Sequence, residues 1–380
     1  MLGNVNKWQK FVIKRFIKWP KKDISVRKSL SGITTELSCE RKRTELDLDV
    51  KLPMAEDMGE AKNTKALFFV HIPKTAGTSF RKAAEEYFSF ESVCYDYSLD
   101  SAETSDLVRK FIYEEKDYLG LNTALSETEI LFISGHVPAK KYVHLLGASQ
   151  LVTFLRDPVQ RVLSEYNHFL RHKNYEGDLP SFYRKPQFIN RHSKMLHGLP
   201  IEALGFIGLT EDYDVSLSQL NALFGTAFQR RKLNQGREAK DKAYEVPDDQ
   251  LKEMQELNAV DIALYQKVVE LYKQRYALFV KGLPYVHGTI QQLNSKVIKG
   301  WAWYAQGERA VTIEVLVDDK KVADLVANDL CPGLLHLSPP RNGYIGFHYR
   351  FSKPLGAGVN VSVRVSETEQ VLGQQEVVVV

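Results

Sequence analysis

The stretch that decides the fold is ALFFVHIPKTAGTSFRKAAEEYF, residues 66–88. It opens with an apolar run, 66–72, and continues through a segment of turn residues, 73–79. Apolar residues then recur at helical spacing from Phe80 to Phe88. A short apolar run bounded by Pro and Gly predicts a buried strand, and the spacing after it predicts a helix. The stretch therefore predicts a strand, a tight loop and a helix, which is the repeating unit of an α/β fold.

The loop has the composition of an anion site. It combines one cation with small and hydroxyl-bearing residues: Lys74, Thr75, Ala76, Gly77, Thr78 and Ser79. Backbone N–H groups at a helix start, together with the helix dipole, attract negative charge. Gly77 permits close approach of the backbone, and Lys74 adds a positive charge. The alternative is an ordinary turn with a surface lysine. The missing GxxxxGK[ST] pattern disfavours an ordinary nucleoside triphosphatase.

A second motif, LVTFLRDPVQRVLSEYNHF, occupies residues 151–169. Its apolar start predicts another strand, with Asp157 capping a helix whose first residue is Pro158. Arg156 then stands at the carboxyl end of the strand, where open α/β sheets bind ligands. Ser164 follows two helical turns later, and the pair offers donors for a second phosphate. Taken alone, Arg156 could instead pair with a carboxylate.

The third motif, ILFISGHVPAKKY at residues 130–142, predicts a strand that runs into His136. Histidine has the reference pKa that suits a general base near neutral pH. His136 would lie at the same edge of the sheet as the other two motifs. His71, at the start of the first loop, is the second candidate for the base, with orientation of the loop as its alternative role.

The segment HIPKTAGTSF resembles the 5′-phosphosulfate loop of sulfotransferases that use 3′-phosphoadenosine 5′-phosphosulfate (PAPS). It is closest to the heparan sulfate and uronyl 2-O-sulfotransferase branch and its bacterial relatives, and the likeness spans residues 65–283. The resemblance implies a P-loop-like parallel sheet flanked by helices. It also implies that the loop Thr75–Ser79 cradles the phosphosulfate and that Lys74 contacts its bridging oxygen. By the same resemblance Arg156 and Ser164 hold the 3′-phosphate, and His136 is the catalytic base. No metal is expected.

The acceptor expected from this branch is a carbohydrate hydroxyl, in a bacterial surface glycan or glycolipid. The downstream segments 206–220 and 258–265 are expected to be helical. A basic cluster on a loop, formed by Arg230, Arg231, Lys232 and Arg237, could contact a cofactor phosphate, an anionic acceptor or solvent alone.

After Pro284 the pattern changes to short alternating segments separated by turn residues, which predicts a small antiparallel β-sandwich. It resembles an accessory domain of bacterial enzymes of surface-polysaccharide assembly. Trp301, Trp303 and Phe347 are expected to be buried and not to serve as sugar platforms. The predicted organisation is a basic helix at 1–22, a linker at 23–62, a sulfotransferase domain at 63–283 and the β-sandwich at 286–380. Because every site motif precedes Pro284, the sulfotransferase domain is expected to fold alone.

Residues 1–28 hold nine Lys or Arg and one acid, whereas the whole chain carries a net charge of only +4. On a helical wheel, Trp8, Phe16 and Trp19 share an apolar face opposite lysines, and Pro20 ends the helix. Such a helix suits an anionic membrane surface, and the alternative is docking on the protein's own surface or on a partner. The terminal position of this charge argues against nucleic-acid binding.

Three scattered cysteines and the lack of a long apolar segment predict a cytoplasmic protein, peripheral to the membrane at most. Two other classes stay open on the sequence alone. One is a glycan-binding protein without catalysis, and the other is a nucleotide-dependent phosphotransferase.

Overall fold

The computed structural model describes residues 66–229 and 243–378. A parallel sheet contains β1 (Leu67–Val70), β2 (Val93–Asp96), β3 (Phe132–Gly135), β4 (Leu151–Leu155) and β5 (Phe206–Leu209). The helices are α3 (Gly77–Phe88), α4 (Asp106–Val108), α5 (Tyr118–Glu127), α6 (Val143–Leu146), α7 (Pro158–His172), α8 (Leu179–Tyr183), α9 (Arg191–Met195), α10 (Tyr213–Phe224), α11 (Asp248–Leu257) and α12 (Ala259–Val280). Short 3₁₀ turns lie at Ala139–Lys141, Ala148–Gln150, Ile201–Ala203, Pro332–Leu337 and Pro340–Gly343, and a π-helical turn at Arg109–Glu114.

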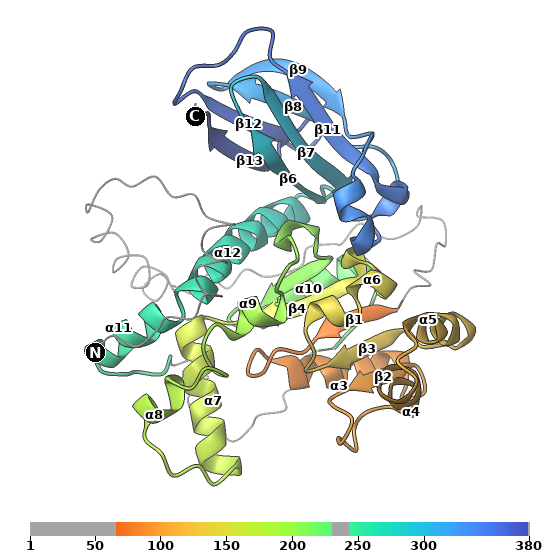
Figure 1. Cartoon of the computed structure of the whole chain (residues 1–380), viewed down its shortest axis with the longest axis vertical. Coiled ribbons are helices and arrows are strands. Elements are labelled where there is room, and N and C mark those ends of the chain that lie inside the picture. The colour runs from red at the N-terminus through yellow and green to blue at the C-terminus, as the bar shows by residue number, and fades with distance from the viewer. Residues whose placement is uncertain (1–65, 230–242, 379–380) are drawn as a thin grey trace. The chain divides into compact units, whose positions relative to one another are not determined.

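The strand order is β2-β3-β1-β4-β5, and every neighbouring pair is parallel. The five strands therefore run the same way (Figure 1). This confirms the predicted α/β class. One expectation was wrong, because Phe206–Leu209 is strand β5 and only the segment after it, α10, is helical. The run FIGL is buried along its whole length against β4, and a strand buried on both faces lacks the alternation that would identify it.

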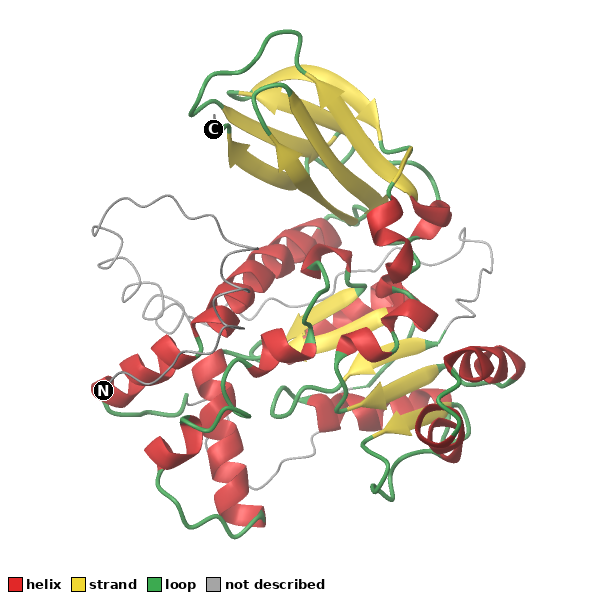
Figure 2. Ribbon diagram, viewed as in Figure 1, coloured by secondary structure: helices red, strands yellow, loops and turns green. Residues whose placement is uncertain are grey.

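Figure 2 shows helices on both faces of the parallel sheet, and alternate residues of β1 pack against opposite layers of them. Leu67 and Phe69 share one core with Phe80 of α3, together with residues of α10. Phe68 and Val70 share the other with residues of α5, α6 and α12. Since side chains point to alternating faces of a strand, β1 is apolar throughout because both of its faces are covered.

The C-terminal part is a sandwich of two antiparallel four-stranded sheets, as predicted. The first has the order β10-β11-β7-β6 and the second β13-β12-β8-β9. Their bounds are β6 (Val286–Leu293), β7 (Val297–Tyr304), β8 (Thr312–Val317), β9 (Lys320–Val326), β10 (Asp329–Leu330), β11 (Tyr344–Arg350), β12 (Asn360–Val365) and β13 (Val371–Glu376). Trp301, Trp303 and Phe347 are at most 2% exposed, which confirms that they are core residues.

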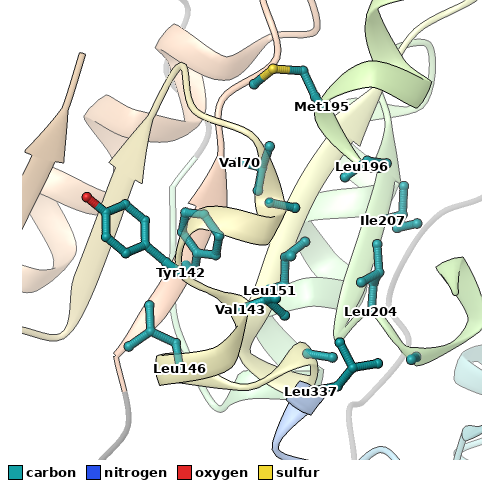
Figure 3. Packing of buried hydrophobic residues seen from close by; sticks show 14 of the residues in the cluster. Val70, Tyr142, Val143, Leu146, Leu151, Met195, Leu196, Leu204, Ile207 and Leu337 are labelled. Atoms are coloured by element: carbon teal, nitrogen blue, oxygen red, sulfur yellow. The ribbon is translucent and has the colours of Figure 1, made fainter. Parts of the chain in front are cut away.

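The β-sandwich shares a hydrophobic core with the α/β sheet. Trp301, Trp303 and Leu337 belong to the same buried cluster as Val70 and Leu151. Figure 3 shows Leu337 among side chains of the α/β part, such as Leu204 and Val143. Polar contacts add to this core. The ring of His287 is bonded through Nδ1 to the backbone oxygen of Glu202 at 2.9 Å, and Gln274 of α12 donates to the Val371 oxygen.

The sequence led us to expect that residues 63–283 fold alone, and the shared core reverses that expectation. We expect a chain ending at Leu283 to lose its native packing. The truncation uncovers the apolar neighbours of two buried tryptophans and of Leu337. Each large apolar side chain contributes about 1.5–3 kcal/mol on burial, so the loss approaches the whole stability of a typical domain. Near-ultraviolet circular dichroism and urea unfolding measure this directly.

Two leucines of one turn provide the matched control in the full chain. Leu337 is fully buried, whereas Leu335 is 47% exposed. Leu337→Ala should lower the free energy of unfolding by about 2–5 kcal/mol, and Leu335→Ala by less than about 0.5 kcal/mol. A truncated chain with a cooperative transition and native spectrum would show that the sheet does not need the sandwich.

Candidate functional site

Three loops meet at the carboxyl edge of the sheet. Val70, the last residue of β1, pairs with Gly135 of β3 on one side and with Thr153 of β4 on the other. The strand order reverses at β1, which is where open α/β sheets bind ligands. The chain segments that leave these strands carry His71–Ser79, His136 and Arg156 respectively. The structure thus brings together the three motifs singled out in the sequence.

The loop after β1 is held open around the start of α3. Lys74 and Ala76 adopt left-handed backbone conformations, with φ of 70° and 64°. The buried Thr75 hydroxyl is turned inward and donates to the Ile72 oxygen at 2.9 Å. Helix α3 begins at Gly77 without a side-chain cap. In the described ranges, the N–H groups of Gly77 and Thr78 have no hydrogen-bond acceptor, so they are available to a ligand.

Lys74 supplies the positive charge of this loop. Its pKa is lowered, first by burial and then by the nearby Arg156. Within the part of the chain that the structure describes, the Lys74 ammonium forms no ion pair. Residues 71–82 contain no acid, and none lies in the first turn of α3. The charge of Glu165 acts in the opposite direction and raises the pKa of Lys74, but burial and Arg156 outweigh it. Free backbone donors beside a lysine that is in no ion pair are the donor set that a phosphate or sulfate group requires.

His136 is fixed by the same loop. Its Nδ1 lies 2.6 Å from the backbone oxygen of His71, and a carbonyl can only accept. The proton of the neutral ring is therefore on Nδ1, which leaves the Nε2 lone pair free. The ring reaches solvent, yet the protein packed around it, together with Arg191 and Arg81, lowers the pKa of His136. A neutral imidazole with a free Nε2 has the form of a general base.

Arg156 lies on the opposite side of the loop, directly after β4. One of its guanidinium nitrogens is 3.5 Å from the Lys74 backbone oxygen, and its guanidinium carbon is 5.9 Å from the centre of the Tyr244 ring. Asp157 caps α7 by accepting from the Gln160 N–H at 2.9 Å, as predicted. Ser164 is 8% exposed in the middle of α7. Arg156 therefore adjoins the loop directly, whereas no contact joins Ser164 to the loop in the described residues.

Sequence reasoning missed β2 and the aromatic residue that follows it. The Tyr97 hydroxyl lies 3.0 Å from Nδ1 of His71, and the Tyr97 ring is 4.9 Å from that of His136. Arg81, one turn into α3, lies over the Tyr97 ring and forms an ion pair with Glu103. The only signal in the sequence was the segment VCYDY at 93–97, whose alternation is too short to identify a strand.

Several predicted features lie outside the described residues: the basic helix at 1–22, the linker at 23–62 and the cluster at 230–237. No helix of the described residues is long and apolar enough to cross a membrane. The described residues also contain no group of three potential metal ligands.

Comparison with known proteins gives one match to a family. Residues 61–199, which hold every predicted site residue, match the model of the sulfotransferase family. No curated protein gives a significant match. A crystal structure of a sulfotransferase from Alicyclobacillus acidocaldarius is similar at 14% identity and a TM-score of 0.29, over 57% of this chain and 96% of that chain. That likeness is too weak to carry an assignment. The family match supports sulfuryl transfer as the class of reaction.

Gly77 is required by the packing of His71. A Cβ at position 77 would lie 2.0 Å from Cδ2 and 2.3 Å from Nε2 of the His71 ring. We therefore expect Gly77→Ala to displace this ring and lower the free energy of unfolding by about 1–3 kcal/mol, the usual effect of overpacking. Urea unfolding measures the change.

A double-mutant cycle with His71→Ala provides the control, because removing the ring leaves room for the added methyl group. Gly77→Ala should then cost much less in the His71→Ala background. Equal costs in both backgrounds would show that the two residues do not compete for this space.

Proposed function

We propose that the chain transfers a sulfuryl group from PAPS to a hydroxyl of a carbohydrate acceptor. The observation that carries the proposal is the meeting of two elements at one sheet edge. One is an anion-binding loop with free N–H groups and an unpaired Lys74, and the other is His136 with its free Nε2. A base beside an anion site is what transfer to a neutral hydroxyl needs.

The residues divide between binding and chemistry. Lys74 and the backbone of 75–79 would hold the 5′-phosphosulfate, while Arg156 and Ser164 would hold the 3′-phosphate. PAPS would supply an activated sulfuryl group with a phosphate as its leaving group. His136 Nε2 would remove the proton of the acceptor hydroxyl, and the Lys74 ammonium would stabilise the charge that develops on the leaving oxygen. Lys74, His136 and Arg156 lie on the segments that leave the carboxyl ends of β1, β3 and β4, an arrangement that would hold the reacting atoms close together.

The identity of the acceptor rests on the resemblance to a family. A carbohydrate acceptor, in a bacterial surface glycan or glycolipid, follows from the likeness of HIPKTAGTSF to the 2-O-sulfotransferase branch. The basic, amphipathic segment 1–22 would bring such an acceptor to the enzyme if it binds an anionic membrane. Labelled PAPS offered with neutral, acidic and lipid-linked glycans would identify the acceptor. Transfer to none of them would remove the carbohydrate from the proposal.

The cofactor site is tested by calorimetric titration with adenosine 3′,5′-bisphosphate. We expect the wild-type chain to bind it and Arg156→Ala to bind it more weakly by roughly 1.5–3 kcal/mol, the range for a charge-assisted contact. Arg309→Ala, in the β-sandwich where Arg309 is exposed and paired with Glu367, is the matched control. Unchanged affinity in a folded Arg156→Ala variant would remove this arginine from the site, and preference for ATP would favour a phosphotransferase.

The base is tested by the pH dependence of turnover. Because the pKa of His136 is below its ordinary 6.5, the ring is neutral at pH 7 and becomes protonated as the pH falls. Activity should therefore be level above pH 6.5 and fall with a one-proton slope at lower pH. His136→Ala should lower turnover about 10²–10⁴-fold, leave bisphosphate affinity intact and abolish this acidic limb. An acidic limb that persists in His136→Ala would assign the base to another group.

A further inference from the structure

His71 is buried and enclosed on all sides. It is 6% exposed, and its ring centre lies 4.2 Å from that of His136 and 5.5 Å from that of Phe69. Its position over Gly77 places the ring at the first residue of α3. His71 therefore adjoins both halves of the proposed site, the base and the anion-binding helix start.

The His71 ring is held in its neutral form. Burial, His136, Arg81 and Lys74, in that order, bring the pKa of His71 well below its ordinary value. No acid is among these causes. A neutral imidazole carries one proton, on either Nδ1 or Nε2, and the partner of one nitrogen decides which.

Tyr97 is that partner. Its hydroxyl lies 3.0 Å from Nδ1 of His71. Burial raises the pKa of Tyr97, so the hydroxyl keeps its proton. Arg81 and Ser134 both lie close enough to the Tyr97 oxygen to act on its pKa by hydrogen bonding, in the direction that lowers it, and a guanidinium can only donate. With donors from these two residues directed at its oxygen, the Tyr97 O–H points to Nδ1 of His71, which places the His71 proton on Nε2.

We propose that His71 donates its Nε2–H to the anion held at the start of α3, and that Tyr97 is the positioning residue that fixes this tautomer. The proposal rests on the proposed function, because it assumes that the loop binds the 5′-phosphosulfate. The Cδ2–Nε2 edge of the ring lies beside Gly77, whose N–H is one of the free donors of the helix start. The imidazole thus adds a side-chain donor to the backbone donors of Gly77 and Thr78.

The two histidines then have opposite tautomers and separate tasks. His136 keeps its proton on Nδ1, bonded to the His71 backbone oxygen, and presents a free Nε2. His71 keeps its proton on Nε2 and presents a donor. A neutral donor suits this position, because a cation with its ring centre 4.2 Å from that of His136 would weaken the base.

Nitrogen-15 spectra of histidine-labelled full chain, recorded without ligand, test the tautomer. His71→Gln and His136→Gln variants identify the two sets of ring signals. We expect His71 to show a protonated Nε2 and His136 a protonated Nδ1, and Tyr97→Phe to shift His71 towards a mixture of tautomers. Tyr95→Phe is the matched control, because the Tyr95 hydroxyl bonds to Glu85. A protonated Nδ1 on His71, or an imidazolium at pH 7, would overturn the proposal.

Binding of adenosine 3′,5′-bisphosphate tests the donor. His71→Phe keeps a ring but loses the N–H, so the dissociation constant should rise roughly tenfold, as for one lost hydrogen bond. His71→Gln, which retains a donor, should recover part of this loss. Equal affinity of His71→Phe and wild type would contradict the donor role. Failure of the proposed function can be told from failure of the donor role. In the first case the wild-type chain would not bind the bisphosphate at all, and the ligand-free spectra would still decide the tautomer of His71.

Discussion

The site depends on the position of β1 in the middle of the parallel sheet. Its last residue, Val70, pairs with both β3 and β4, and the Thr153 hydroxyl donates to the Val70 oxygen at 2.8 Å. The three loops that leave these strands must therefore start within a few ångströms of one another. Because His71 directly follows Val70, its backbone oxygen can fix His136 while its ring lies over Gly77. One register thus sets His136, the loop at 73–79 and Arg156 in place.

The motif-bearing parts of this arrangement could be predicted from the sequence. Each βα unit carries local signals that do not depend on the rest of the chain. The Pro and Gly of the first loop and the Asp157–Pro158 start of α7 are examples. Parallel strands place their carboxyl ends at one edge, so the nearness of Lys74, His136 and Arg156 follows from the fold class alone.

Features that depend on contacts between distant segments could not be predicted. Tyr97 reaches His71 only through the pairing of β2 with β3, and nothing near Tyr97 in the sequence identifies its partner. Strand β5 is too short and too uniformly apolar to be told from a helix. The sequence predicts Trp301 in the core of the sandwich, whereas the structure places it in the buried cluster of the α/β sheet. The change of pattern at Pro284 therefore marks a change of architecture within one compact unit.

The central claim is that the start of α3 holds the 5′ end of the nucleotide. The most direct test is a crystal structure of the full chain with adenosine 3′,5′-bisphosphate. The account predicts the 5′-phosphate on the N–H groups of Gly77 and Thr78 beside Lys74, with the 3′-phosphate near Arg156 and Ser164 and His136 Nε2 facing the acceptor side. A nucleotide bound at another edge of the sheet, or with its 5′-phosphate away from this loop, would contradict it.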